Sequence, residues 1–205
     1  LDPNDPGPIL PERGLLAQLR IGWSYSTLRR FAYDISASEG AYLAANIAAA
    51  APAIGSQYRS VSLSWVAQTY LRNPLWPSHV LALRYAGGIS EGDLGRRGIF
   101  SVGGFPTVSI VDALTQFILL GGAALRGYPT NARFGTQYHL GQAEYRFPIF
   151  RPQIGPATVP IYLSRLYGGV FLDVGDAFSG RLDLSTFLFG TGAELLIDFT
   201  LGYYL

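Results

Sequence analysis

Cysteine, methionine and lysine are all absent from the 205 residues, and charged residues are scarce. The lack of cysteine excludes disulfides and thiolate metal sites. The lack of methionine, even at position 1, predicts that the chain follows an upstream segment or a cleaved signal peptide. Charged residues make up 14% of the chain, where about 25% is usual in a soluble domain. We therefore expect much of the surface not to face water, and a net charge of +1 argues against nucleic-acid binding.

The patterns that usually carry covalent chemistry are missing as well. The two histidines, His79 and His139, are far apart in sequence and have no carboxylate cluster with metal-ligand spacing. The glycine-rich stretch 121–127 is not followed by Lys-Ser/Thr, so it is not a phosphate-binding loop. No Gly-x-Ser-x-Gly element occurs. The sequence predicts no metal, no cofactor and no enzymatic activity.

What the sequence does contain is long runs in which apolar and polar residues alternate. A period of two predicts β-strands, and the first run, residues 15–25, is longer than the typical soluble strand of about 5–6 residues. A strand that crosses a membrane needs about 9–11 residues. We expect eight strands, in the runs 15–25, 31–36, 41–47, 61–67, 81–85, 143–147, 166–174 and 193–201.

Charged residues share one side of these runs. Arg20, Arg84, Glu144, Asp173 and Glu194 all have the polar-face parity of their strands. Arginine on the lipid face of a membrane barrel costs about 2–4 kcal/mol at the midplane, whereas a lumen wall tolerates it. A soluble β-sandwich would show the same alternation with the apolar side inward, so parity alone leaves both folds open. Strand length favours the membrane fold.

Aromatic residues near the strand ends favour it further, because membrane barrels carry aromatic girdles at both interfaces. The candidates are Trp23, Tyr25, Tyr70, Tyr85, Phe147, Tyr203 and Tyr204. Backbone groups in lipid must all be paired, so such a sheet has to close. The sequence therefore predicts an all-β fold, an antiparallel transmembrane β-barrel over residues 14–205. Residues 1–13, with four prolines, are expected to be a loop or linker.

A segment of about 50 residues, 87–136, separates the fifth and sixth expected strands. Loops longer than about 12–15 residues are uncommon and are usually functional. This loop contains a glycine pair followed by Leu125, Arg126, Gly127 and Tyr128. After it come the runs Glu-Tyr-Arg-Phe-Pro (144–148), Phe-x-Asp-x-Gly (171–175) and Gly-Ala-Glu-Leu (192–195).

These four elements, in this order, resemble the BamA-type superfamily of outer-membrane assembly and translocation barrels, which includes the two-partner secretion transporters. The resemblance implies that the chain corresponds to the later part of a sixteen-stranded barrel, with loop 87–136 folded back into the lumen. It further implies a place in the bacterial outer membrane, with unfolded client polypeptides and upstream periplasmic domains as partners. The implied work is insertion of outer-membrane proteins or passage of polypeptides across the membrane.

The resemblance also implies a set of residues that hold the loop: Arg126, Gly127, Tyr128, Glu144, Phe171, Asp173 and Gly175. An arginine drawn out of water needs an acid, and parity points both Asp173 and Glu144 into the lumen. We predict that Arg126 pairs with Asp173, with Glu144 nearby. Gly127 would let the loop tip turn tightly. A small eight-stranded barrel would leave no room for the loop, because its own side chains fill the interior.

Two other functions remain open at this point. The chain could form a passive pore or a membrane anchor without insertase activity, since its inner face carries charges of both signs. It could also be a soluble β-sandwich or small barrel that binds an apolar ligand.

Overall fold

The structure is a computed structural model, and it describes residues 14–29, 31, 37–93, 99–104, 124–150 and 161–201. Within these residues the fold is all-β, with two short 3-10 turns, Pro52–Ile54 and Leu184–Thr186, as its only helical elements. No helix in the described part is long and apolar enough to cross a membrane. The all-β expectation is confirmed for these residues.

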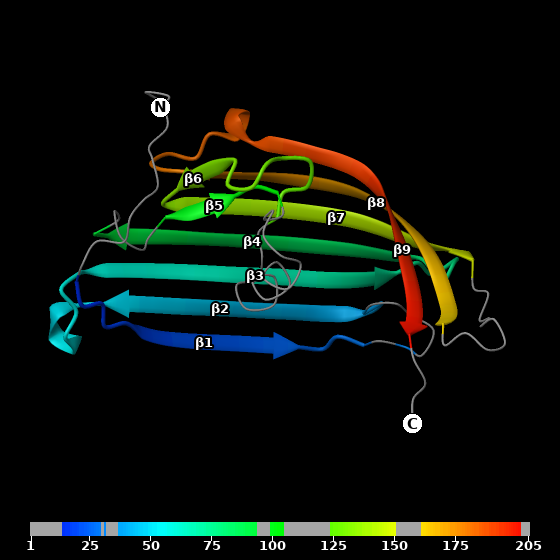
Figure 1. The fold of residues 1–205 in the computed structure, drawn as a ribbon, viewed down its shortest axis with the longest axis horizontal. Helices are drawn as coiled ribbons and strands as arrows, with labels where there is room; N and C mark the ends of the chain where they lie inside the picture. The colour runs from blue at the N-terminus through cyan, green and yellow to red at the C-terminus, as the bar shows by residue number, and fades with distance from the viewer. Residues whose placement is uncertain are drawn as a thin grey trace.

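Seven long strands form one antiparallel sheet in the order β1-β2-β3-β4-β7-β8-β9 (Figure 1). The first four are β1 (Leu19–Ser26), β2 (Gly40–Ala50), β3 (Ser60–Arg72) and β4 (Val80–Gly92). The last three are β7 (Gln137–Phe150), β8 (Ile161–Phe178) and β9 (Leu188–Leu201). A separate pair, β5 (Phe100–Val102) and β6 (Arg133–Gly135), lies against β7 and β8 (Figure 1).

The sheet has one strand fewer than the eight expected. The missing one is the run 31–36, which lies outside the described residues except for Phe31, and Phe31 is not in a strand. The strands on either side of that run pair directly, from Leu19 with Ala49 to Ser26 with Tyr42. No strand therefore lies between β1 and β2. Residues 1–13, the expected linker, are also outside the described part.

Several strands are longer than their sequence pattern predicted, because glycines interrupt the alternation without ending the strand. The pattern placed a loop from Gly87, yet β4 runs on to Gly92. A Cβ added at Gly87 would lie 2.5 Å from the indole of Trp65, so that ring covers the glycine from the neighbouring strand. The rings of Phe100 and Tyr138 cover Gly88 in the same way. These contacts replace the packing that a glycine lacks in a strand.

One face of the sheet, here called the apolar face, carries large hydrophobic side chains that are left exposed. Their exposed fractions lie between 39% and 63%. Contiguous apolar patches larger than a few hundred Å² mark contacts with protein or membrane. The members are Leu19, Ile21, Trp23, Tyr25, Leu43, Ile47, Val61, Leu71, Tyr85, Ile89, Val170, Leu172, Phe189, Leu195 and Ile197.

The opposite face, here called the charged face, carries the ionised side chains and is partly covered by the loop between β4 and β7. Asp173 and Leu140 both lie on this face, and both are fully buried. Tyr70 lies on this face and is 8% exposed. Its place in an aromatic girdle on the opposite face was therefore a wrong prediction. Tyr203 and Tyr204 lie outside the described residues.

Both edges of the sheet, β1 and β9, carry no further strand among the described residues. Six antiparallel pairings separate these two strands, so β1 and β9 run in the same direction. They cannot pair antiparallel with each other. An all-antiparallel barrel that contained this sheet would need an odd number of additional strands between its two edges.

Candidate functional site

The described parts of the loop, residues 99–104 and 124–135, form a small unit that sits on the charged face. Ala124 makes a parallel bridge with Gly103, and the Leu125 amide donates to the Gly103 carbonyl at 2.6 Å. Leu125 is fully buried in a cluster with Val102, Leu140 and Ala177. Two of these residues come from the loop unit and two from the sheet. Apolar packing thus holds the loop directly beside Arg126.

The guanidinium of Arg126 binds three carboxylates from three different strands. Its Nε donates to Asp173 Oδ2 at 2.8 Å and its Nη2 to Asp173 Oδ1 at 2.8 Å, a bidentate pair. Its Nη1 donates to Glu144 Oε2 and to Glu194 Oε2, each at 3.1 Å. The Arg126 amide also donates to Asp173 Oδ2 at 3.1 Å. The predicted pairing of Arg126 with Asp173, with Glu144 nearby, is confirmed.

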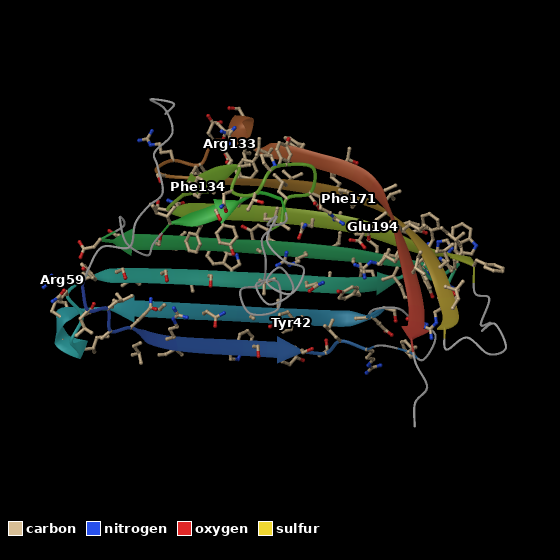
Figure 2. The ribbon with its side chains drawn as sticks, in the orientation of Figure 1. Tyr42, Arg59, Arg133, Phe134, Phe171 and Glu194 are labelled. Atoms are coloured by element: carbon tan, nitrogen blue, oxygen red, sulfur yellow. The ribbon has the colours of Figure 1, made fainter. Side chains whose placement is uncertain are left out.

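Phe171 completes the environment of the guanidinium. The Cζ of Arg126 lies 3.6 Å from the centre of the Phe171 ring, which is a close cation–π contact. Phe171 and Asp173 are two residues apart on β8, so both side chains reach the same face. Figure 2 shows Phe171 and Glu194 close together on the last two strands of the sheet.

Burial and charge act in opposite directions on the arginine. Burial lowers the pKa of Arg126, but the hydrogen bonds and the negative charges of Asp173 and Glu144 outweigh it, so the pKa is raised above its ordinary value. The arginine side chain is 16% exposed, and that of Asp173 is fully buried. A buried carboxylate left without its cation is strongly unfavourable. The site therefore strongly favours the docked position of the loop.

The residues that follow Arg126 fix the direction of the loop tip. Gly127 has a φ of 91°, in the left-handed region that glycine adopts without strain. The turn expected there is confirmed. The hydroxyl of Tyr128 donates to the Phe189 carbonyl of β9 at 3.0 Å. The loop tip is thus attached to β9 by Tyr128 as well as by the contact of Arg126 with Glu194.

Two glycines of the sheet make room for this arrangement. A Cβ at Gly190 would lie 2.2 Å from the Arg126 carbonyl oxygen, so only glycine allows the loop backbone to come this close to β9. A Cβ at Gly175 would lie 2.8 Å from Leu140 Cδ1 and 2.9 Å from the His139 carbonyl oxygen. Gly175 therefore leaves space for the buried Leu140, against which Leu125 packs.

A wider polar network surrounds the three carboxylates. Arg146 forms an ion pair with Glu144, and its guanidinium also lies 5.9 Å from the centre of the Tyr70 ring. On the other side, Arg84 donates to Gln142 at 2.7 Å, and Gln142 donates to the Ala124 carbonyl at 3.0 Å. The network connects four strands of the sheet to the loop backbone on both sides of Leu125.

All seven residues named from the sequence take part in this arrangement or border it, but their functional role stays a prediction. Glu194 and Gly190 were missed as site residues. Glu194 has the same polar-face parity as Glu144 and Asp173 and belongs to the Gly-Ala-Glu-Leu run (192–195), so the sequence did contain a signal for it. Gly190 had no such signal, because its role depends on the position of the Arg126 backbone.

The arrangement is suited to holding a segment in place rather than to bond-making chemistry. The three carboxylates around Arg126 are occupied by its guanidinium. Among residues 14–29, 31, 37–93, 99–104, 124–150 and 161–201, no group of three or more histidines and acids is placed to hold a metal ion.

No protein-family model matches this sequence, and a comparison with curated proteins also gives no match.

Proposed function

We propose that this chain forms part of an outer-membrane β-barrel that assists the insertion of outer-membrane proteins or the translocation of polypeptides. The observation that carries the proposal is the anchored loop, in which Arg126 is held by Asp173, Glu144 and Glu194 on the charged face of the sheet. A loop fixed inside the lumen by an arginine and acids of the barrel wall is the feature that the BamA-type resemblance implies.

The two faces of the sheet support a membrane location. The apolar face is exposed, while the charged face is partly covered by the loop, over β7 and β8. A soluble sandwich would bury the apolar side chains and expose the charged ones. The third alternative, a soluble ligand-binding barrel, is therefore less well supported. Backbone groups at a sheet edge cannot stay unpaired in lipid, so the proposal requires further strands that close the barrel between β9 and β1.

Aromatic clusters at two levels of the apolar face match the interfacial girdles of membrane barrels. One cluster gathers Trp65, Tyr85 and Phe178 around His139, with ring centres 5.9 to 6.2 Å from the imidazole. The other gathers Trp76, Tyr145 and Phe147 around His79, with ring centres 5.6 to 6.2 Å away.

These two levels lie at a separation that suits a membrane. His139 and Tyr145 are six residues apart on β7, which is about 20 Å along a strand. The apolar band of membrane barrels is about 25 Å tall. Rings that combine an apolar body with a polar tip favour the water interface.

In the proposed mechanism the protein makes no covalent change in its client. A barrel in this superfamily would offer strand edges and a hydrated lumen to a client chain, as β-augmentation does elsewhere. The Arg126 contacts would keep the loop in the lumen and so set the shape of the path. Loss of these contacts is expected to change how clients pass without removing the barrel from the membrane.

A reconstitution experiment tests this proposal. The full-length protein and its Arg126→Ala variant are folded into phospholipid vesicles, and the folding rate of an added outer-membrane client is measured by its heat-modifiable gel mobility. We expect wild-type vesicles to accelerate client folding and the variant to accelerate it less, although both insert equally well. Arg20→Ala is the control, because Arg20 is exposed on the edge strand and its Nε donates to the nearby Gln18, away from the loop.

Two outcomes would count against the proposal. Failure of the wild-type protein to enter vesicles would remove the membrane location. Insertion with steady ion conductance but no effect on any client would favour the passive pore or anchor, the alternative left open by the mixed charges of the inner wall.

A further inference from the structure

The apolar face contains a furrow whose floor is made of small residues. It is part of a depression of about 450 Å³ over β2, β3, β4, β7 and β8. On β7 the floor is Gly141 and Ala143; on β4 the wall is Leu83 and Tyr85, and on β8 it includes Leu172. The lining is almost entirely apolar, as expected of a surface that contacts hydrocarbon.

The strand register explains why the floor of the furrow is low at β7. Gly141 pairs with Tyr85 on β4, and Ala143 pairs with Leu83 on β4 and with Leu172 on β8. Directly opposite residues in a sheet have neighbouring side chains, so each small residue lies between two larger ones. A Cβ added at Gly141 would meet nothing closer than the Val174 carbonyl oxygen at 3.9 Å. The floor is therefore open space and is not filled by a neighbouring side chain.

One side of the furrow adjoins a polar pair. The hydroxyl of Tyr85 lies 2.7 Å from Nδ1 of His139. Tyr85 also lines the furrow, so the polar pair adjoins the apolar floor. A phenol and an imidazole supply both donors and acceptors of hydrogen bonds. Phosphate and ester oxygens accept such bonds, and lipid heads carry these groups.

We propose that this furrow binds one membrane lipid, with an acyl chain along Gly141 and Ala143 and the polar head at the Tyr85–His139 pair. The inference rests on the proposed function, because only a membrane-embedded sheet presents this face to lipid. An amphipathic ligand matches the furrow, since its acyl chain covers the apolar floor while its head reaches the hydroxyl and the imidazole at the interfacial level. On β7 the lining covers Gly141 to Ala143, and the furrow continues across the sheet over β2, β3, β4 and β8.

The site can be tested by fluorescence quenching. Trp65 stands beside His139, with 6.2 Å between ring centres, whereas Trp23 lies at the same register level on the edge strand. In protein carrying Trp23→Phe and Trp76→Phe, Trp65 is the only tryptophan that fluoresces. In protein carrying Trp65→Phe and Trp76→Phe, Trp23 is the only one. Both are solubilised in detergent and titrated with phosphatidylethanolamine that carries brominated acyl chains.

We expect saturable quenching of Trp65 at low lipid, while Trp23 is quenched only as lipid enters the whole micelle. Gly141→Leu, which fills the floor, should raise the half-saturating lipid concentration for Trp65 at least several-fold. Ala45→Leu adds a similar volume on the apolar face outside the furrow and should leave the curve unchanged. His139→Phe keeps a ring but removes the polar pair, and should weaken binding by about tenfold, the effect of losing one hydrogen bond.

Equal quenching of Trp65 and Trp23, or a Gly141→Leu curve identical to wild type, would overturn the lipid site. Neither result bears on the membrane location. That location is tested separately, by quenching of all three tryptophans in vesicles made of brominated lipid. Absence of quenching in those vesicles would instead remove the proposed function, and the lipid site with it.

Discussion

Replacing Arg126 by alanine is the most direct perturbation of the anchored loop, and its size can be worked out from the contacts. The change removes two bonds of 2.8 Å to Asp173, one of 3.1 Å to Glu144, and one of 3.1 Å to Glu194. It also removes the stacking on Phe171. The Asp173 carboxylate is fully buried and, among the residues that the structure describes, keeps only the backbone amide of residue 126 as a hydrogen-bond donor.

Removing one partner of a buried ion pair costs about 3–5 kcal/mol. The loop is a local unit on an intact sheet, so we expect this cost to appear as opening of the loop and not as unfolding of the sheet. A change of that size raises the equilibrium constant for local opening by about 10²- to 4 × 10³-fold.

Hydrogen exchange measures this opening. The amides of Leu125 and Gly104 donate to carbonyls within the loop unit, at 2.6 and 2.9 Å, and should lose most of their protection in the Arg126→Ala variant. Amides of β2 and β3, which lie two or more strands away from β7 in the sheet, should keep theirs. Arg20→Ala, on an exposed edge-strand arginine, serves as the control.

A double-mutant cycle separates the ion pair from simple loss of packing. Asp173→Ala alone leaves Arg126 with Glu144 and Glu194, whereas the double variant removes both members of the buried pair. We expect the free energy of loop opening to change less in the double variant than the sum of the changes in the two single variants. In the double variant neither Arg126 nor Asp173 remains as a buried charge without its partner. Wild-type protection of Leu125 in Arg126→Ala, or strict additivity in the cycle, would refute the account of the site.

Three further changes probe the backbone contact, the packing and the two faces. Gly190→Val should displace the loop as strongly as loss of the arginine, since its Cβ would lie 2.2 Å from the Arg126 carbonyl oxygen; unchanged exchange of the loop amides would contradict this close approach. Leu125→Ala empties a fully buried site and should lower the free energy of loop docking by about 2–5 kcal/mol, measured by the same exchange; a loss below 1 kcal/mol would mean that the cluster does not hold the loop. Leu172→Arg on the apolar face should make the free energy of folding into vesicles less favourable by about 2–4 kcal/mol, while Ser64→Arg on the opposite face should change it little. Equal changes would show that the two faces do not differ in their surroundings.

The assignment of faces could be predicted from the sequence because it depends only on local geometry. Successive side chains in a strand point to opposite sides, so the parity of Glu144 and Asp173 placed both on one face without knowledge of the fold. The same holds for the turn at Gly127, since a left-handed φ is a property of the residue itself. Local geometry was not enough to predict the pairing of Arg126 with Asp173. That prediction came from the family resemblance, which rests on the order of four short sequence elements.

The strand ends and the rest of the site depended on contacts between distant parts of the chain. Gly87 stays in a strand because Trp65, on the neighbouring strand, covers it, and no local pattern contains that information. Tyr70 lies beyond the expected end of its strand at residue 67, and because β3 continues to Arg72 the alternation turns Tyr70 to the charged face.

The sequence by itself thus determined that the chain is all-β, which side chains share a face, and where a tight loop turn lies. Only the tertiary structure decided that three carboxylates from β7, β8 and β9 meet one guanidinium and that Gly190 must lack a side chain. It also decided that Gly141 and Ala143 lie between larger residues of two other strands. The physical reason is that parity is a property of a single strand, whereas register and loop docking arise from packing between segments far apart in the chain.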